Sequence, residues 1–241
     1  MQSRSNASLT QTNWDLIRDA SSGSPTAAKS LDAVARRSWP AIYAFIRASG
    51  RNGQDAAELT QGFLCDVFLS RHLLEKADPG RGRFRTLLIG AVRNYLADMH
   101  RRKTAARRMP VDGIAALDQM REHGHEPAVE SSPERAFHAR YVGTLIRDAA
   151  ERLQRELLAE NDEASWEIFR ARVLEGVAGA NHGYEPIAER FGITRGECAA
   201  RLLVTKRRFA AMLMDEIRAT IESPDDLRTE IQELLELLRQ S

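Results

Sequence analysis

Hydrophobic residues recur every three or four positions along most of the chain, which is the period of an amphipathic α-helix. The clearest example lies between residues 84 and 103. Its apolar positions, all on one helical face, are Phe84, Leu87, Leu88, Ala91, Val92, Tyr95, Leu96 and Met99. No run of alternating apolar and polar residues reaches the length of a strand. The sequence therefore predicts an all-α protein.

The helical pattern divides into two regions, because the stretch between them carries prolines, glycines and serines and no apolar stripe. We therefore expect two helical domains joined by a flexible linker. The predicted boundaries are a flexible N-terminus at 1–23, a helical bundle at 24–108, the linker at 109–132, a second domain at 133–214 and an acidic helical extension at 215–241. Trp39-Pro40 is predicted to break two helices within the bundle. Cys65 and Cys198 lie in apolar helical patterns and are predicted to be buried free thiols.

A capping box predicts the start of a helix in the second domain. In Thr194-Arg195-Gly196-Glu197, the side chains of Thr194 and Glu197 can each accept a hydrogen bond from the other's backbone amide. A short helix that ends at Gly192 precedes this box, so the layout is that of a helix-turn-helix. Cys198, Leu202, Thr205 and Phe209 would face the core, while Ala200, Val204, Arg207 and Arg208 would point outward.

The charges are sorted along the chain, although the 241 residues carry a net charge of only +1. Residues 80–108 hold nine basic residues and one acid, a net charge of +8. Residues 190–212 carry +5, and the tail from 215 to 241 carries −5. Two tethered basic helical surfaces indicate bipartite contact with nucleic acid, because phosphate contacts release counterions and tethering raises the effective concentration. The alternative is that both basic faces are simply solvated.

Other function classes find little support in the sequence. The longest apolar runs are six residues, far below the roughly 20 that a membrane span needs, and the first residues do not form a signal peptide. We therefore expect a cytoplasmic protein without membrane contact. The chain has no P-loop, HExxH or Gly-x-Ser-x-Gly motif, and its basic regions lack the acidic clusters that hold catalytic metals. Neither an enzyme nor a cofactor or metal site is predicted.

Several of these segments resemble the extracytoplasmic-function group of bacterial RNA polymerase sigma factors, and the resemblance covers most of the chain. Region two of that family resembles residues 39–47 (WPAIYAFIR), 55–64 (DAAELTQGFL) and 82–88 (GRFRTLL), followed by Arg93-Asn94, Asp98 and Arg101-Arg102. Region four, the family's helix-turn-helix, resembles residues 184–194 (YEPIAERFGIT). The order and spacing of these segments indicate the family more specifically than any single segment does.

The resemblance implies a polymerase contact and a promoter contact in region two. The helix that contains residues 55–68 would dock on the clamp helices of the polymerase β′ subunit. Its carboxylates would pair with arginines of the partner, and its apolar groups would supply buried area. Its candidate residues are Asp55, Glu58, Gln61, Phe63, Leu64 and Phe68. The loop from Asp78 and the helix after it would hold the opened −10 strand and a flipped base. Their candidate residues are Asp78, Arg81, Arg83, Arg85, Arg93, Asn94, Arg101 and Arg102.

The resemblance also implies that region four enters the −35 major groove and that the polymerase β flap is a second contact. The candidate residues are Thr194, Arg195, Glu197, Arg201, Arg207 and Arg208. The sequence departs from the family at Ala199, Ala200, Leu203 and Val204, where relatives are usually polar or basic. Weak −35 binding is therefore one expectation, and the loop Val177 to Gly183 is long for the family.

The resemblance implies a sigma factor that directs core RNA polymerase to promoters and promotes DNA opening. Two alternatives stay open: a stand-alone helix-turn-helix regulator of duplex DNA, and a sigma-like interaction protein without promoter activity. A plain core helix explains the apolar stripe of residues 55–68 equally well. The acidic end forms an amphipathic helix that packs on the protein, competes with DNA for a basic surface, or binds a regulator such as an anti-sigma factor.

Overall fold

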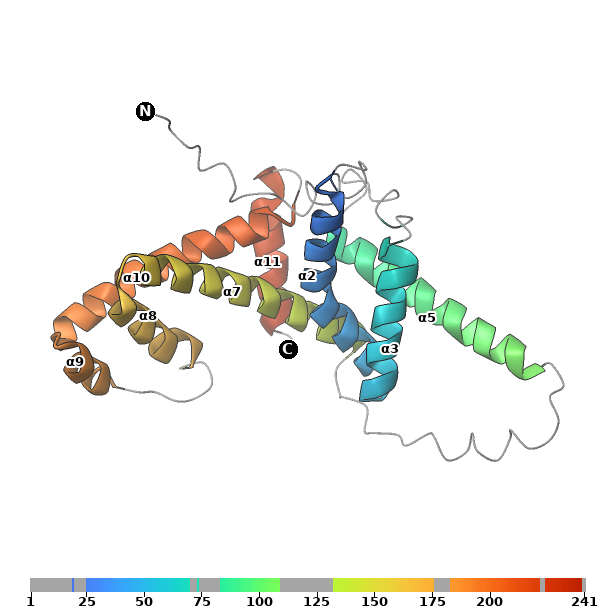
Figure 1. Ribbon diagram of the computed structural model, residues 1–241, viewed down its shortest axis with the longest axis horizontal. Coiled ribbons are helices and arrows are strands. Elements are labelled where there is room, and N and C mark those ends of the chain that lie inside the picture. Colours follow the sequence, from blue (N-terminus) through green and yellow to red (C-terminus); the bar gives the residue numbers. More distant parts are fainter. Residues whose placement is uncertain are drawn as a thin grey trace. The chain divides into compact units, whose positions relative to one another are not determined.

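The computed structural model describes Asp19, Leu73 and residues 25–69, 83–108, 132–175, 183–221 and 224–239. These ranges contain helices and no strand, which confirms the all-α class (Figure 1). The predicted flexible N-terminus except Asp19, most of the linker and most of the loop at 177–183 lie outside them. None of the helices in the described ranges combines the length and the apolar character of a membrane span.

The chain divides into two compact units, residues 1–144 with 218–241, and residues 145–217. This division differs from the predicted boundaries in one respect. The sequence analysis placed 133–144 in the second domain and made 215–241 a separate extension, whereas the structure groups 133–144 and 218–241 with the N-terminal half.

The first unit is built from helices on both ends of the chain. Its elements are α2 (Ala27–Ala48), α3 (Gly53–Phe63), the π-helix η1 (Leu64–Leu69), α5 (Phe84–Arg108), the start of α7 (Pro133–Ala159), the 3-10 helix η5 (Pro224–Asp226) and α11 (Leu227–Arg239). Helix α2 packs against α3, η1 and α5 (Figure 1). Its largest fully buried side chains are Ile42, Ile46, Phe63, Phe84, Leu88 and Phe137. Side chains from α2, α3, α5 and α7 therefore make up its core.

Helix α2 runs without a break through Trp39-Pro40, so the predicted interruption is wrong. A proline inside a helix removes one backbone hydrogen bond and costs about 3 kcal/mol. Val34 before the proline and Ile42 and Phe45 after it are all buried on the same side of the helix. Burial of each such side chain stabilises by about 1.5–3 kcal/mol, so continuing the helix outweighs the lost bond.

The predicted apolar stripe of α5 faces the core, with Phe84, Leu88, Val92 and Tyr95 all buried. The ring of Tyr95 meets Phe63 of α3 edge-on, with 5.6 Å between centroids. These contacts fix the rotation of α5 and leave its opposite face to solvent. Cys65 is a free thiol as predicted, but its predicted burial is wrong, because it lies on the exposed side of η1.

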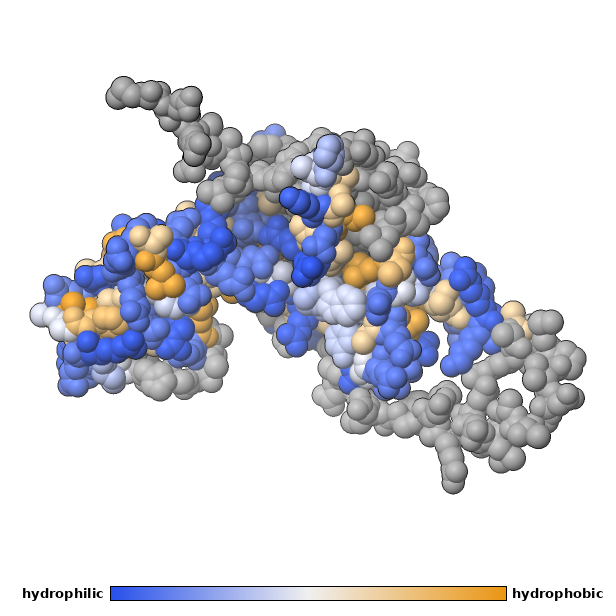
Figure 2. Space-filling view, in the orientation of Figure 1, coloured by the Kyte–Doolittle hydropathy of each residue, from blue (hydrophilic) through white to orange (hydrophobic). Residues whose placement is uncertain are grey.

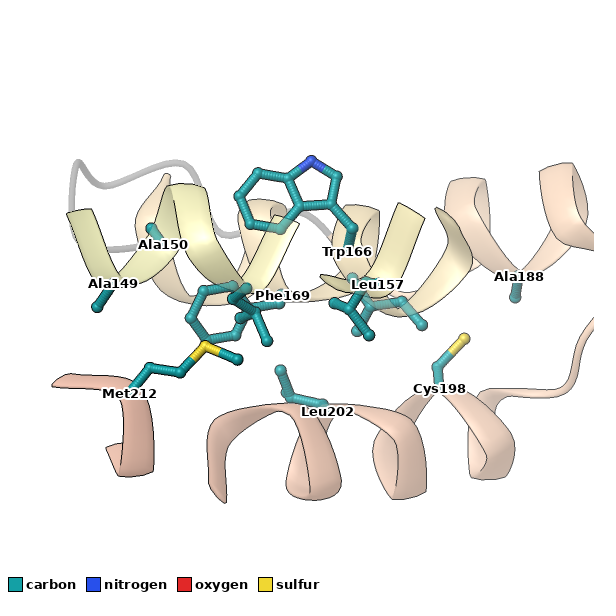
Figure 3. Packing of buried hydrophobic residues seen from close by; sticks show 11 residues of the cluster. Ala149, Ala150, Leu157, Trp166, Phe169, Ala188, Cys198, Leu202 and Met212 are labelled. Carbon is teal, nitrogen blue, oxygen red and sulfur yellow. The ribbon is translucent and has the colours of Figure 1, made fainter. Parts of the chain in front are cut away.

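The second unit consists of the rest of α7, α8 (Glu163–Phe169), the π-helix η3 (Arg170–Leu174), α9 (Glu185–Phe191) and nearly all of α10 (Arg195–Arg218). Figure 3 shows Leu202 and Cys198 of α10 lying opposite Leu157 and Phe169. Cys198 is fully buried, as predicted. The surface of the described residues is mostly hydrophilic in the view of Figure 2.

The turn between α9 and α10 has the predicted geometry. Gly192 ends α9 in the left-handed region at φ +63°, and the Ile193 amide donates to the Ala188 carbonyl at 3.0 Å. The Thr194 amide donates to the Glu197 carboxylate at 2.7 Å, and the Glu197 amide donates to the Thr194 hydroxyl at 3.2 Å. These bonds confirm the capping box and the start of the second helix of the helix-turn-helix.

We predict opposite effects of alanine at the two glycines of this turn. Gly192→Ala places a side chain in the left-handed region and should lower the free energy of unfolding by about 1 kcal/mol. Gly196→Ala lies in the first turn of α10, where an added Cβ meets nothing closer than 3.9 Å, and should raise it by about 0.5 kcal/mol. Urea denaturation followed by circular dichroism measures both. Equal effects would contradict the assignment of Gly192 as the helix stop.

Candidate nucleic-acid interface

The exposed cations of α5 lie in the later part of the helix. The side chains of Arg93 and Arg101 are 58% and 76% exposed. Arg93 pairs with Glu134 at 2.5 Å, and Arg101 pairs with Asp98 on the same helix. Asn94, Arg102 and Lys103 are also exposed. Exposed ion pairs contribute only about 0–1 kcal/mol, so Arg93 and Arg101 can exchange their partners for phosphates at little cost.

The start of α5 is different, because its arginines are held by the C-terminal helix α11. Arg85 donates from Nε to Glu230 Oε1 and from Nη2 to Glu230 Oε2, both at 3.1 Å. Its Nη2 also donates to Glu233 Oε2 at 2.6 Å. Arg83 pairs with Glu230 at 2.8 Å and with Glu233. We call these four side chains the α5–α11 ion-pair cluster.

Arg85 is a predicted contact of the opened −10 strand, but it does not lie on the exposed face of α5. Its side chain is 6% exposed, and that of Glu230 is 1% exposed. The helical period places Arg85 at the edge of the apolar stripe, between Val92 and Leu96, and α11 covers this edge. A buried charge needs a partner, and the two carboxylates of α11 provide it.

Side chains of α7 and of the segment after α10 surround this cluster. Burial raises the pKa of Tyr141 to about 12, and the nearby Glu230 carboxylate acts in the same direction. The Tyr141 hydroxyl is hydrogen-bonded to Thr220. Burial also lowers the pKa of His138, and the Arg85 charge adds to this effect. The Nδ1 atom of His138 is buried and has no hydrogen-bond partner in the described part of the chain. The cluster thus lies in a partly dry environment, where electrostatic attraction is stronger than in water.

We predict that Arg85 is required for stability, whereas Arg93 is not. Arg85→Ala leaves Glu230 buried without its bidentate partner and should lower the free energy of unfolding by about 3–5 kcal/mol. Arg93→Ala removes an exposed pair and should change it by less than about 1 kcal/mol. Chemical denaturation of both variants provides the comparison. An Arg85 variant as stable as the Arg93 variant would show that the cluster is not formed.

His138 should make the stability depend on pH. Its lowered pKa means that the folded chain binds fewer protons than the unfolded chain below the ordinary value of 6.5. The stabilisation that neutral His138 provides is complete above pH 6.5 and is lost progressively as the pH falls toward the pKa of His138 in the folded chain. His138→Gln should make the urea midpoint depend less on pH between about pH 5 and 7. His100→Gln, at an exposed position, should leave the wild-type slope unchanged.

Most candidate residues of the helix-turn-helix are engaged within their own unit. Thr194 and Glu197 form the capping box, and Arg195 pairs with Glu185. Arg201 pairs with Asp162 at 2.6 Å. Arg208 pairs with Glu160 at 2.7 Å and, through this hydrogen bond, holds the pKa of Glu160 below its ordinary value. Of the six candidates, only the exposed Arg207 makes no hydrogen bond or ion pair to the residues the structure describes.

The outward face of α10 is apolar, as its sequence indicates. Leu203 and Val204 are 54% and 56% exposed, and Ala199 and Ala200 are exposed beside them. This face offers methyl groups and few hydrogen-bond donors. It can contact thymine methyl groups but cannot read most base edges.

The candidate polymerase-binding residues divide between the surface and the core. Asp55, Glu58 and Gln61 are exposed along α3. Asn52 caps the helix, because its side-chain Oδ1 accepts a hydrogen bond from the Asp55 amide at 2.8 Å. Phe63 is fully buried, so it positions α3 and cannot offer area to a partner, contrary to the prediction. Leu64 is half-buried.

The sequence analysis missed a groove of about 260 Å³ between α3 and α5. Its lining combines residues of α3 and of the turn before it with residues of α5: Arg51, Asp55, Glu58, Leu59, Leu96, Met99, His100 and Lys103. No local pattern reveals that these two helices pair. The remaining candidates, Asp78, Arg81 and the side chain of Phe68, lie outside the described residues.

Comparison with known proteins adds no relative to this description. No family model matches the chain, and no match is found among curated proteins or among solved structures.

Proposed function

We propose that this protein is a sigma factor of the extracytoplasmic-function type, which binds core RNA polymerase in the cytoplasm and directs it to promoters. The observation that carries the proposal is the division of α5 into two faces. One face is anchored in the core by Phe84, Leu88 and Val92. The other presents Arg93, Arg101 and neighbouring cations to solvent, as a helix following a nucleic-acid backbone requires.

The exposed carboxylates of α3 support a separate contact with polymerase. Asp55 and Glu58 project into solvent beside the groove between α3 and α5. An acidic helix surface of this kind suits the arginines of a partner helix, and the adjacent groove can accept an apolar side chain. Polymerase and DNA would thus use different surfaces of the first unit.

The second unit supports a weaker role in promoter recognition. Its helix-turn-helix is correctly capped, but the arginines at 195, 201 and 208 are paired within the unit. Arg207 and the apolar face of α10 remain for DNA. This pattern disfavours a stand-alone regulator that binds duplex DNA tightly. It favours, as the second candidate function, a sigma-like interaction protein that binds polymerase without promoter output.

A paired charge reversal tests the proposal. Arg93→Glu with Arg101→Glu should reduce transcription from promoter DNA by at least about 10-fold, because several phosphate contacts become repulsive. Binding to core polymerase, measured by co-elution on gel filtration, should persist because α3 is unchanged. Arg36→Glu with Arg140→Glu carries the same charge change at exposed positions on α2 and α7 and should leave transcription near the wild-type level.

The outcomes separate the candidate functions. Wild-type protein that fails to bind core polymerase at moderate salt contradicts the proposal. Polymerase binding without transcripts from wild-type protein favours the interaction protein. A footprint on duplex DNA in the absence of polymerase favours the stand-alone regulator.

A further inference from the structure

The α5–α11 ion-pair cluster joins the most basic stretch of the chain to its acidic end. Residues 80–108 carry +8 and residues 215–241 carry −5, and the two segments meet where Arg83 and Arg85 contact Glu230 and Glu233. Carboxylate and phosphate oxygens offer a guanidinium group the same bidentate acceptors. The glutamates of α11 therefore occupy donor groups that could otherwise bind a phosphate backbone.

Among the side chains of α11 that the structure describes, few apolar groups are buried. Leu234 is 4% exposed, whereas Leu235 beside it is 48% exposed. The helix has only 13 residues, and isolated helices of this length are marginal in water. Charge pairing therefore contributes much of its attachment. Elements with few buried apolar contacts are those that open most readily in native proteins.

The cluster also has an inner and an outer part. Glu230 is 1% exposed, whereas the Glu233 side chain is 41% exposed. Arg83, at 24% exposed, is the more accessible of the two arginines. An incoming polyanion can therefore replace Glu233 at Arg83 before the buried Arg85–Glu230 pair opens. This gradation gives a stepwise route for exchanging carboxylates with phosphates.

We propose that α11 is a built-in inhibitor of nucleic-acid binding, in which Glu230 and Glu233 block Arg83 and Arg85 until a polyanion displaces them. The inference rests on the proposed function for the identity of that polyanion as promoter DNA. The competition between carboxylates and phosphates does not require polymerase, so it can be measured separately.

The test uses the full-length chain and a fluorescently labelled single-stranded oligothymidine, with affinity measured by anisotropy over a series of salt concentrations. Glu230→Gln with Glu233→Gln should bind about 10-fold more tightly than wild type. The slope of log affinity against log salt should steepen by about 1.4, since each added phosphate contact on a single strand contributes about 0.7. Glu233→Gln alone, which retains the Arg85–Glu230 pair, should give an intermediate affinity.

The matched control is Asp226→Asn with Glu236→Gln. Both side chains are exposed in the same C-terminal segment, and the variant changes the net charge by the same amount without releasing Arg83 or Arg85. Its affinity should stay near the wild-type value. Equal gains in the double variant and the control would overturn the inference, because net charge alone would explain them. The inference also falls if Glu233→Gln binds like wild type while the double variant loses helical circular dichroism, since α11 would then be only a structural cover.

Addition of core polymerase to the same variants distinguishes this inference from the proposed function. If no variant binds polymerase but the double variant gains oligonucleotide affinity over the control, the inference stands and the proposed function fails. If all variants support promoter transcription equally and oligonucleotide affinity is unchanged, the function stands and the inference fails.

Discussion

A buried guanidinium group must find a carboxylate, and this requirement ties the two ends of the first unit together. Arg85 lies at the start of α5, 145 residues before Glu230, yet both side chains are almost fully buried against each other. A lone charge in such a place would cost several kcal/mol. The acidic segment 218–241 therefore belongs physically to the N-terminal unit, although it follows α10 in the chain.

The arginines of α5 and those of α10 differ in how strongly they are held by acidic partners. On α5, the side chains of Arg93 and Arg101 are exposed and their ion pairs are weak, so these cations remain available to a polyanion. On α10, Arg201 and Arg208 reach acids on neighbouring segments and are themselves half-buried. The same residue type is therefore exposed in the later part of α5 and takes part in internal packing on α10.

Local patterns predicted much of the fold because they depend on residues close in sequence. The apolar stripe from Phe84 to Tyr95 follows from helical period, and the Thr194–Glu197 capping box follows from two side chains three residues apart. Local rules failed where tertiary burial decided the outcome. Pro40 stays inside α2 because the core holds both halves of the helix, and the exposure of Cys65 depends on how η1 is rotated.

For the candidate site, the sequence by itself determined the helices, their caps and the separation of basic and acidic segments. Those properties depend on backbone hydrogen bonding and on side-chain order, which are local. Only the tertiary structure decided which charged groups reach solvent. Helical period places Arg93 opposite the core and Arg85 at the edge of the apolar stripe, and α11 covers Arg85 while it leaves Arg93 exposed. Charge pairing over 145 residues depends on how helices pack, and no local pattern encodes it.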